Sequence, residues 1–259
     1  MFAHPSQNQL LSALPERDWR QLQPLLEWVE LPRGTRLYDA GSALSHVYFP
    51  VTAIVSLTET MQSGASAEIA LVGHEGIVGV CAYLGDCVSL SGAVVQSAGF
   101  GLRMPAQSIR MAAQGSTTLM HELLRYTQVL FSQVAQTSAC SRHHALEQQL
   151  CRWLLSFLDR SRGDEMALTQ DQMAQMLGVR REGVTVAALK LQKAGLIRYG
   201  RGRINIIDRV GLEERSCECY AVVREAYDRL AEDKELALRT GTGHRHGQAP
   251  YHAARAANA

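Results

Sequence analysis

The feature that most constrains the fold is the stretch 168–194, where two short helical patterns meet at a glycine. Thr169 and Gln172 have the spacing of a capping box, so a helix should begin there. Gly178 can adopt the left-handed conformation that ends such a helix. A second helical pattern follows and stops at Gly195. Two helices joined by a tight glycine turn form a helix-turn-helix.

Long polar side chains stand at the start of the second helix. In a helix-turn-helix this end points into the major groove, and its unpaired N–H groups favour phosphate. Arg181 could bond a guanine edge through two parallel hydrogen bonds, and Glu182 could accept from a cytosine amino group. Arg180 suits the sugar-phosphate chain, and Thr185 could offer a hydroxyl or a methyl group to a base. The same residues could instead form a solvated face on an ordinary helix pair.

A hairpin is predicted directly after the second helix. Residues 196–207 contain two short β-favouring runs around Gly200-Arg201-Gly202. Such a hairpin forms a wing, and Arg198, Arg201 and Arg203 along it suit a neighbouring phosphate strand. Each arginine could equally serve only to keep the hairpin tip soluble.

The charge distribution favours a nucleic-acid partner for the same segment. The net charge is only +1, but residues 1–118 carry 6 basic and 9 acidic side chains, whereas residues 142–203 carry 11 basic and 6 acidic ones. The excess positive charge therefore coincides with the two-helix motif, as binding to phosphates requires.

The run from Leu168 to Asp208 resembles the winged helix-turn-helix of the Crp/Fnr family of bacterial transcription regulators. The resemblance rests on the threonine that opens the first helix, the glycine turn and the Arg-Glu pair. It implies a homodimer that reads double-stranded promoter operators, with Arg181 and Glu182 contacting bases. The full set of expected DNA contacts is Thr169, Gln170, Arg180, Arg181, Glu182, Thr185, Arg201 and Arg203.

Two positions depart from the best-known family pattern. Val186 stands where the cyclic-AMP-binding member has a second arginine, and Gly183 stands where a hydroxyl residue often contacts phosphate. The operator should therefore differ from the best-known one.

The N-terminal half has a different sequence pattern. After helical pieces interrupted by Pro15 and Pro24, short β-favouring runs alternate with turn signals about every ten residues up to Pro105. This spacing predicts an antiparallel sandwich or jelly roll. Residues 31–50 resemble the opening of the family's cyclic-nucleotide-binding β-roll. The expected fold class is thus α+β: an N-terminal β-roll, a long dimerisation helix and a C-terminal winged helix-turn-helix.

The effector of the β-roll is left open. In nucleotide-binding relatives a glycine-glutamate pair holds the ribose, and an arginine holds the cyclic phosphate. Here Val80 occupies the glutamate position, and no arginine lies between Glu75 and Arg103. Because a buried phosphate without a cation is costly, we expect no cyclic AMP binding by the usual chemistry. His74 and Glu75 could serve another ligand but are expected to be exposed turn residues.

A long helix is predicted over 116–140. One seam along it repeats at close to 3.5 residues, a spacing typical of two paired parallel helices, although a helix packed on its own domain would look the same. The predicted dimerisation residues are Leu123, Thr127, Leu130, Val134 and Thr137. Three others are expected to face the sensor domain: Leu119, Leu124 and Phe131.

The remaining segments complete the domain organisation. Residues 140–144 predict a polar hinge, 145–161 a core helix, and 210–239 one amphipathic helix. That last helix could support a dimer or contact RNA polymerase, and packing on the winged domain is the simpler expectation. The expected domains are a sensor at 1–115, the dimerisation helix at 116–140, the DNA-binding domain at 141–239 and a disordered tail at 240–259.

Several function classes are disfavoured. We find no phosphate loop, nucleophile elbow, HExxH or paired-carboxylate motif, so we expect no enzyme and no catalytic residues. Six scattered cysteines begin at Cys81, which disfavours the iron–sulfur cluster that some relatives hold on N-terminal cysteines. Cys217-x-Cys219 is too short a spacing to indicate zinc by itself. Adjacent His143 and His144 should point apart. No metal or other cofactor is therefore expected.

No apolar run approaches the roughly 18 residues of a membrane span, and the first residues lack the pattern of a signal peptide. A cytoplasmic protein without a membrane partner is expected. The alternative function is a ligand-sensing module whose winged helix contacts a protein rather than DNA.

Overall fold

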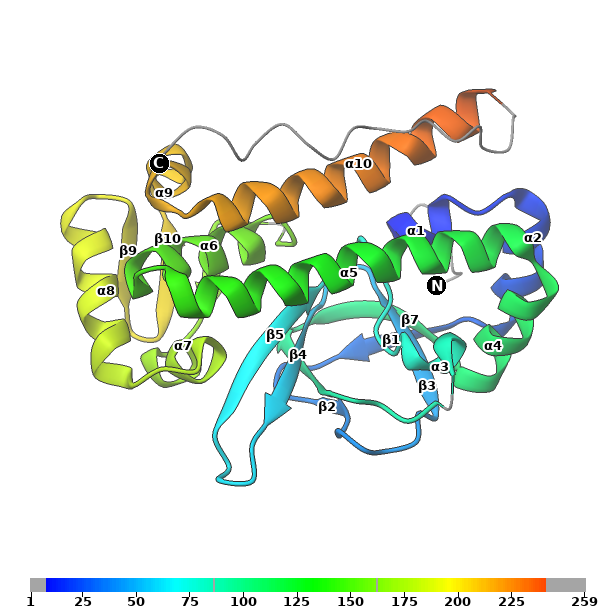
Figure 1. The fold of residues 1–259 in the computed structure, drawn as a ribbon, viewed down its shortest axis with the longest axis horizontal. Helices are drawn as coiled ribbons and strands as arrows, with labels where there is room; N and C mark the ends of the chain where they lie inside the picture. Colours follow the sequence, from blue (N-terminus) through cyan, green and yellow to red (C-terminus); the bar gives the residue numbers. More distant parts are fainter. Residues whose placement is uncertain (1–7, 86, 162, 241–259) are drawn as a thin grey trace.

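The computed structural model describes residues 8–85, 87–161 and 163–240, with the side chains of 233–240 left out (Figure 1). The disordered tail predicted from residue 240 thus lies outside the described residues, except for Thr240 at the end of the last helix. Within the described ranges, no helix is both long and apolar enough to cross a membrane.

Three short helical pieces open the chain, and the two prolines separate them as predicted. They are α1 (Gln9–Ser12), α2 (Glu16–Leu22) and the 3-10 turn η2 (Gln23–Leu25). Pro15 is the N-cap residue of α2, and Pro24 lies within η2. Asn8 fixes α1 to the β-roll, because its side-chain amide donates to the carbonyls of Pro50 and Gly76 at 2.9 Å each.

The next segment confirms the predicted antiparallel jelly roll. One sheet has the order β1-β7-β3 and the other β2-β6-β4-β5, with antiparallel pairing throughout. The strands are β1 (Glu27–Leu31), β2 (Arg36–Tyr38), β3 (His46–Pro50), β4 (Ile54–Thr60), β5 (Ser66–Val72), β6 (Gly92–Ser97) and β7 (Gly99–Pro105). Apolar side chains such as Phe49, Val72 and Leu102 fill the space between the sheets. The short helices α3 (Cys81–Leu84) and α4 (Ala106–Gly115) flank the roll.

The long helix α5 (Thr117–His143) runs the length of the molecule, capped at its start by Ser116 (Figure 1). It presses on the loop before α3, where an added Cβ on Gly76 would lie only 2.1 Å from the Tyr126 ring. Glycine is therefore required for this close approach.

The C-terminal domain begins with α6 (Leu146–Leu158), which is buried from Gln149 to Leu158 as predicted. The winged motif follows, with α7 (Gln170–Leu177) and α8 (Arg181–Lys193) beside a small sheet of order β8-β10-β9. Its strands are β8 (Glu165–Ala167), β9 (Ile197–Gly200) and β10 (Arg203–Ile206). Ile54 and Leu71 of the β-roll join the core of this domain.

The single helix predicted over 210–239 is instead two helices, α9 (Arg209–Arg215) and α10 (Glu218–Thr240). Ser216 ends α9 in an extended conformation, so the chain turns before α10 begins. α10 then runs antiparallel along α5 and also contacts α6, rather than packing on the winged motif alone (Figure 1). The Tyr227 hydroxyl donates to Gln133 of α5 at 2.8 Å, and Leu230 is buried in the core shared with the β-roll.

The two faces of α5 are arranged differently from the prediction. Leu119 faces the sensor as expected, but Leu124 and Phe131 are 47% and 72% exposed. The predicted seam faces inward instead: Leu123 and Leu130 are buried in the core. The other seam positions also have partners within the chain, since Thr127 bonds Tyr83, Val134 packs on the core and Thr137 accepts from Arg152. The outward side of α5, rather than this seam, is therefore the exposed side of the helix.

Candidate nucleic-acid interface

The first helix of the motif begins with the predicted capping box. The Thr169 hydroxyl accepts from the Gln172 amide at 3.2 Å, and the Gln172 side chain accepts from the Thr169 amide at 3.0 Å. These bonds satisfy two backbone donors that a helix start would leave unpaired. Met173 and Ala174 are buried, which fixes the inward face of α7.

A glycine elbow connects α7 to α8. Gly178 has φ +65°, the left-handed conformation that the sequence predicts for the end of α7. Arg180 then serves as the extended N-cap residue of α8, while Val184, Ala188 and Leu191 are buried as predicted. Gly183 faces α6, because an added Cβ there would come within 2.9 Å of the Leu146 side chain. α8 is thereby held close to α6.

The outward start of α8 presents the predicted polar residues. Arg180, Arg181 and Glu182 are all exposed. Arg181 Nε lies 3.5 Å from the Asp171 carboxylate, and both side chains are largely exposed. An exposed pair of this kind is worth roughly 0–1 kcal/mol, so a stronger partner can displace Asp171.

Hydrogen bonds orient the next residues on this face. The Thr185 hydroxyl lies 2.8 Å from Gln170 Oε1 and 3.0 Å from the Arg181 carbonyl. The α7 start and the first turn of α8 thus form one surface that contains Thr169, Gln170, Arg181 and Thr185.

The wing has the geometry of a two-residue hairpin. Gly200 pairs with Arg203, and the two residues between them, Arg201 and Gly202, have φ +51° and +73°. Positive φ at both central positions is typical of a type I′ turn, whose twist matches the adjoining strands. Arg203 forms an ion pair with Glu165 of β8, whereas Arg201 is exposed at the tip.

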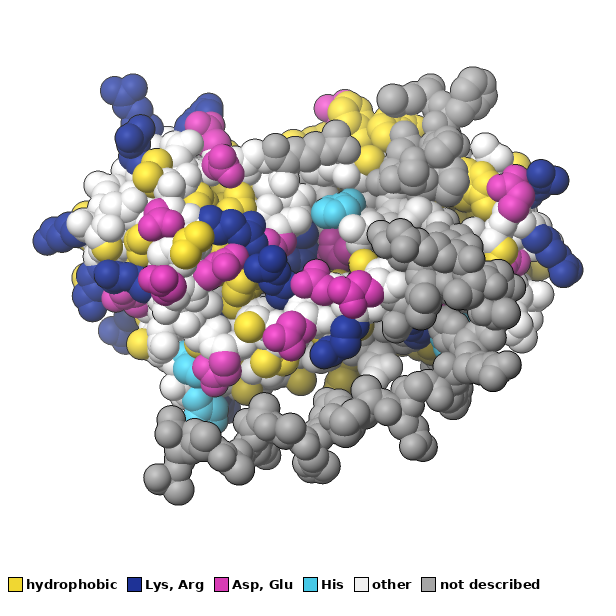
Figure 2. All heavy atoms as spheres, turned by 90° about the horizontal axis from the view of Figure 1, so that it is seen from above, with side chains coloured by type: hydrophobic (Ala, Val, Ile, Leu, Met, Phe, Trp, Pro, Cys, Tyr) yellow, Lys and Arg dark blue, Asp and Glu magenta, His cyan; other side chains and the backbone are white. Residues whose placement is uncertain are grey.

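Basic side chains project from the end of the molecule that carries α8 and the wing, with acidic side chains among them (Figure 2). This is the segment in which the sequence concentrates positive charge. An excess of basic side chains in one segment is what contact with a phosphate backbone requires.

The β-roll contacts α7 directly. Arg33 donates to Gln172 at 2.8 Å, and Gln175 donates to Ser66 of β5 at 2.9 Å. An added Cβ on Gly178 would lie 3.1 Å from Ala67, so the glycine elbow also approaches β5 closely. α7 thus contacts both β5 and α8.

A buried ion pair joins the β-roll to the segment just after α6. The Arg160 guanidinium donates to the Glu75 carboxylate at 2.6 Å, and the two side chains are only 6% and 9% exposed. Burial would lower the pKa of Arg160, but the neighbouring Glu75 carboxylate raises that pKa overall. Arg160 also donates to the Ser156 carbonyl and lies over the Tyr227 ring of α10. The expectation that Glu75 is an exposed turn residue is therefore wrong.

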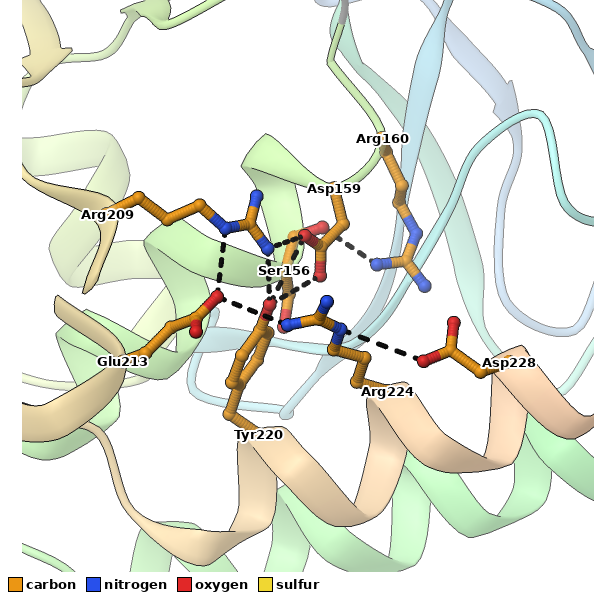
Figure 3. A network of polar contacts seen from close by, with 8 residues as sticks. All are labelled: Ser156, Asp159, Arg160, Arg209, Glu213, Tyr220, Arg224 and Asp228. Carbon is orange, nitrogen blue, oxygen red and sulfur yellow. Dashed lines mark hydrogen bonds and ion pairs between the residues drawn. The ribbon is translucent and has the colours of Figure 1, made fainter.

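A separate polar network lies near this pair and connects the end of α6 to α9 and α10 (Figure 3). Arg209 lies 2.5 Å from Asp159 and 2.9 Å from Glu213. The Tyr220 hydroxyl donates to Asp159 at 3.0 Å, and Arg224 reaches Glu213 at 3.2 Å. All of these residues except Glu213 line a cleft of about 450 Å³, which His74 and Glu75 of the β-roll also line. The network fixes α9 and α10 to the end of α6.

A second buried carboxyl group lies between the domains. Glu68 on β5 accepts from the Trp153 indole of α6 at 2.7 Å and also accepts from the Ser56 hydroxyl. Burial raises the pKa of Glu68 to about 7, although these donors and the nearby Arg152 and Arg160 charges partly oppose the shift. Sequence reasoning singled out neither Glu68 nor Arg160, because no local pattern marks their contacts.

The β-roll contains a pocket of about 360 Å³ at the loop that the resemblance associates with nucleotides. Val80 and Cys81 lie in its wall, and none of the described residues that line it is charged. The complete lining is Tyr38, Leu57, Ile77, Gly79, Val80, Cys81, Leu84, Gly85, Val88, Ser89, Leu90 and Ser91. Such a wall supplies no cation for a phosphate.

Comparison with known proteins gives a consistent result. Residues 148–215 match the model of the Crp-like helix-turn-helix domain. A solved structure assigned to the Crp/Fnr family of transcriptional regulators, from Eubacterium rectale, superposes with a TM-score of 0.65 at 16% identity, covering 81% of this chain and 98% of the other. FixK2 from Bradyrhizobium japonicum gives 0.64 at 16% identity, covering 74% and 98%.

A CRP-family transcriptional regulator from Thermus thermophilus gives 0.62 at 18% identity, covering 73% and 96%. Identities this low show the shared fold and no more. No match was found among curated proteins.

Proposed function

We propose that this chain, which carries a Crp-like helix-turn-helix domain on the fold of the Crp/Fnr regulators, is a homodimeric, sequence-specific DNA-binding transcription regulator. The observation that carries the proposal is the exposed first turn of α8, where Arg180, Arg181 and Glu182 face solvent beside an arginine-bearing wing. Their exposed side chains can enter a groove once Arg181 leaves its weak pair with Asp171. The elbow at Gly178 holds them on one surface.

The residues divide by role. Arg181 and Glu182 read base edges, and Thr185 assists them. Arg180, the α7 start at Thr169 and Gln170, and the wing arginines Arg201 and Arg203 contact sugar and phosphate. The second group sets affinity in a salt-dependent way, whereas the first sets base preference.

A dimer is proposed through the outward side of α5. Leu124 and Phe131 are seven residues apart and exposed, and Gln128 and Ala135 lie on the same face, also exposed. A heptad stripe of this kind pairs two parallel helices. Two-fold pairing would present two copies of α8 to half-sites about one DNA turn apart.

The signal is proposed to act through the contacts between β5 and α7. A ligand that prefers one arrangement of the β-roll would shift the balance between α7 held by Ser66 and Arg33 and α7 released from them. The uncharged sensor pocket favours a signal other than a cyclic nucleotide held by its phosphate. We expect calorimetric titration with cyclic AMP to give no heat of binding, and micromolar binding would contradict this.

Substitution of Arg181 tests the proposal. Selection from random duplexes would first identify the preferred site, and fluorescence anisotropy at two salt concentrations would then measure affinity. Arg181→Ala should weaken binding to that site by about 1–3 kcal/mol and relax preference at one base pair. Arg20→Ala, on the distant helix α2, is the matched control and should change nothing.

Two results would contradict the base-reading role or the DNA partner. If Arg181→Ala weakened specific and random DNA equally, Arg181 would be a phosphate contact. If the wild-type protein selected no sequence at either salt concentration, the alternative of a winged helix that contacts a protein would take the place of this proposal.

The dimer face has its own test. Phe131→Glu should convert the dimer to a monomer in light scattering, because a charge would be buried in the helix pair. Met111→Glu on α4 changes an equally exposed apolar residue, 63% against 72%, and should leave the dimer intact. A dimer that survives Phe131→Glu would show that α5 does not pair through this stripe.

A further inference from the structure

Four side chains with strong metal affinity meet where α5 ends and α10 begins. Cys140 and His144 are one helical turn apart at the end of α5, and Cys217 and Cys219 flank the first residue of α10. One ligand atom from each residue lies within 4.8 Å of all the others. The three cysteines are buried, at 0%, 4% and 0% exposure, and form a cluster of their own.

The spacing of these atoms fits a shared metal ion. Cys140 Sγ and Cys217 Sγ are 3.5 Å apart, and Cys219 Sγ is 3.4 Å from His144 Nδ1. A tetrahedral zinc ion with Zn–S near 2.3 Å places its sulfur ligands about 3.8 Å apart. A disulfide would require about 2.05 Å. The observed distances are therefore close to the edges of a zinc tetrahedron and well outside a covalent S–S bond.

We propose that Cys140, His144, Cys217 and Cys219 bind one zinc ion. Three thiolates and one imidazole are a Cys₃His set, which is typical of closed structural zinc sites. Thiolate ligands disfavour hard cations such as magnesium and calcium. The site is independent of the DNA surface and of the sensor pocket, so it goes beyond the function proposed above.

Outer contacts around the four ligands also suit a metal site. His144 Nε2 lies 3.2 Å from the Glu218 carboxylate, an arrangement that leaves Nδ1 facing the sulfurs. Ligating histidines in proteins usually donate their second ring N–H to a carboxylate, a backbone carbonyl or a water molecule, and Glu218 fits the first of these roles. The Gln136 amide donates to Cys219 Sγ at 3.1 Å. The buried Arg152 offers positive charge against the net negative charge of three thiolates and one divalent ion.

The site connects segments that are far apart in the sequence. Zinc would fasten the start of α10 to the end of α5, at the junction between the long helix and the DNA-binding domain. α10 then continues along α5, with Tyr227 bonded to Gln133. The metal thereby fixes α10 as a brace across that junction, and its loss should loosen the brace.

Metal analysis of the full-length protein, purified under reducing conditions without chelators, tests the assignment. We expect about one zinc per chain by mass spectrometry of the metal. We expect the visible absorption of tetrahedral cobalt when Co²⁺ replaces zinc. Cys217→Ser should lose both signals, whereas Cys81→Ser in the sensor should keep them. Less than about 0.2 metal per chain together with no cobalt spectrum would overturn the site, as would stoichiometric iron in place of zinc.

A milder variant guards against misfolding. Glu218 is 71% exposed, so Glu218→Gln should fold normally and weaken zinc binding about 10- to 100-fold. Glu225→Gln, also on the exposed side of α10, is its control and should leave zinc affinity unchanged. If Glu218→Gln and the wild type bound zinc with equal affinity, the contact between Glu218 and His144 would not support the metal site. If the protein purified without reductant contained a Cys140–Cys217 disulfide and no zinc, the two cysteines would be a redox pair and the zinc proposal would be wrong. These readouts need no DNA, so their failure leaves the proposed function untouched.

Discussion

Two ion pairs in this molecule differ in almost every respect. On the exposed face of α7 and α8, Arg181 and Asp171 are 3.5 Å apart, with side chains 61% and 68% exposed. At the domain junction, Arg160 and Glu75 are 2.6 Å apart and at most 9% exposed. Separation of the first pair costs little, so Arg181 remains available to a ligand. Separation of the second leaves a buried charge, so Arg160 fixes one domain to the other.

The largest loss of stability is expected when Arg160 of the buried pair is substituted. Arg160→Ala leaves the Glu75 carboxylate buried without its partner and removes the cation from the Tyr227 ring. We expect a loss of about 3–5 kcal/mol in the free energy of unfolding, measured by urea denaturation. Arg20→Ala breaks an exposed pair with Glu16 at a similar 2.8 Å and should cost less than about 1 kcal/mol.

Equal losses for the two variants would break the comparison. Burial would then not determine how much an ion pair contributes to the free energy of unfolding. The apolar contacts of Ile54 and Leu71 would instead hold the two domains together.

The face formed by α7, α8 and the wing could be predicted from the sequence because its rules are local. The capping box at Thr169, the left-handed Gly178 and the Gly200–Arg203 hairpin each depend on residues within a few positions of one another. The alternating strands of the jelly roll follow from period-two patterning and regular turns. The sequence also indicated correctly that Val184 and Leu191 face inward.

The contacts between the β-roll and the C-terminal domain could not be predicted from local sequence rules. Glu75 and Arg160 are 85 residues apart, and so are Glu68 and Trp153, so no window of sequence contains either pair. The four potential zinc ligands are likewise divided between two helix ends 77 residues apart, which explains why Cys217-x-Cys219 looked insufficient.

On α5, two neighbouring apolar stripes share nearly the same spacing. The periodicity cannot tell which stripe the chain itself will cover. The structure covers the stripe of Leu123 and Leu130 and leaves Leu124 and Phe131 open.

The contacts between the β-roll and the C-terminal domain should also depend on pH, because they include the buried Glu68 carboxyl group. The folded protein keeps the Glu68 proton up to about pH 7, whereas the unfolded chain releases it near 4.5. Stability should therefore fall as the pH rises across that window and change no further from this group above it. A shift of this size corresponds to about 3 kcal/mol at most.

Glu68→Gln, which keeps a neutral side chain at every pH, should remove this dependence. The measurement is the free energy of unfolding at pH 5 and pH 8 for the wild type, Glu68→Gln and the exposed control Glu30→Gln. The wild type and the control should lose stability in parallel between the two pH values, and Glu68→Gln should lose less. If all three lost the same amount, the Glu68–Trp153 contact would not be the pH-sensitive part of the junction.

The smallest effect is expected at the wing tip, where substitution of Arg201 should change only how DNA affinity depends on salt concentration. Arg201 is exposed and adopts φ +51°, a conformation that asparagine also tolerates. Arg201→Asn therefore removes a charge without disturbing the turn. The slope of log affinity against log salt concentration should become shallower by about 1, with the preferred DNA sequence and the free energy of unfolding unchanged. Arg36→Asn, at an exposed sensor pair with Asp39, should leave the slope as it is. If Arg201→Asn altered base preference instead, the wing would read sequence, and α8 would no longer be the sole source of specificity on this surface.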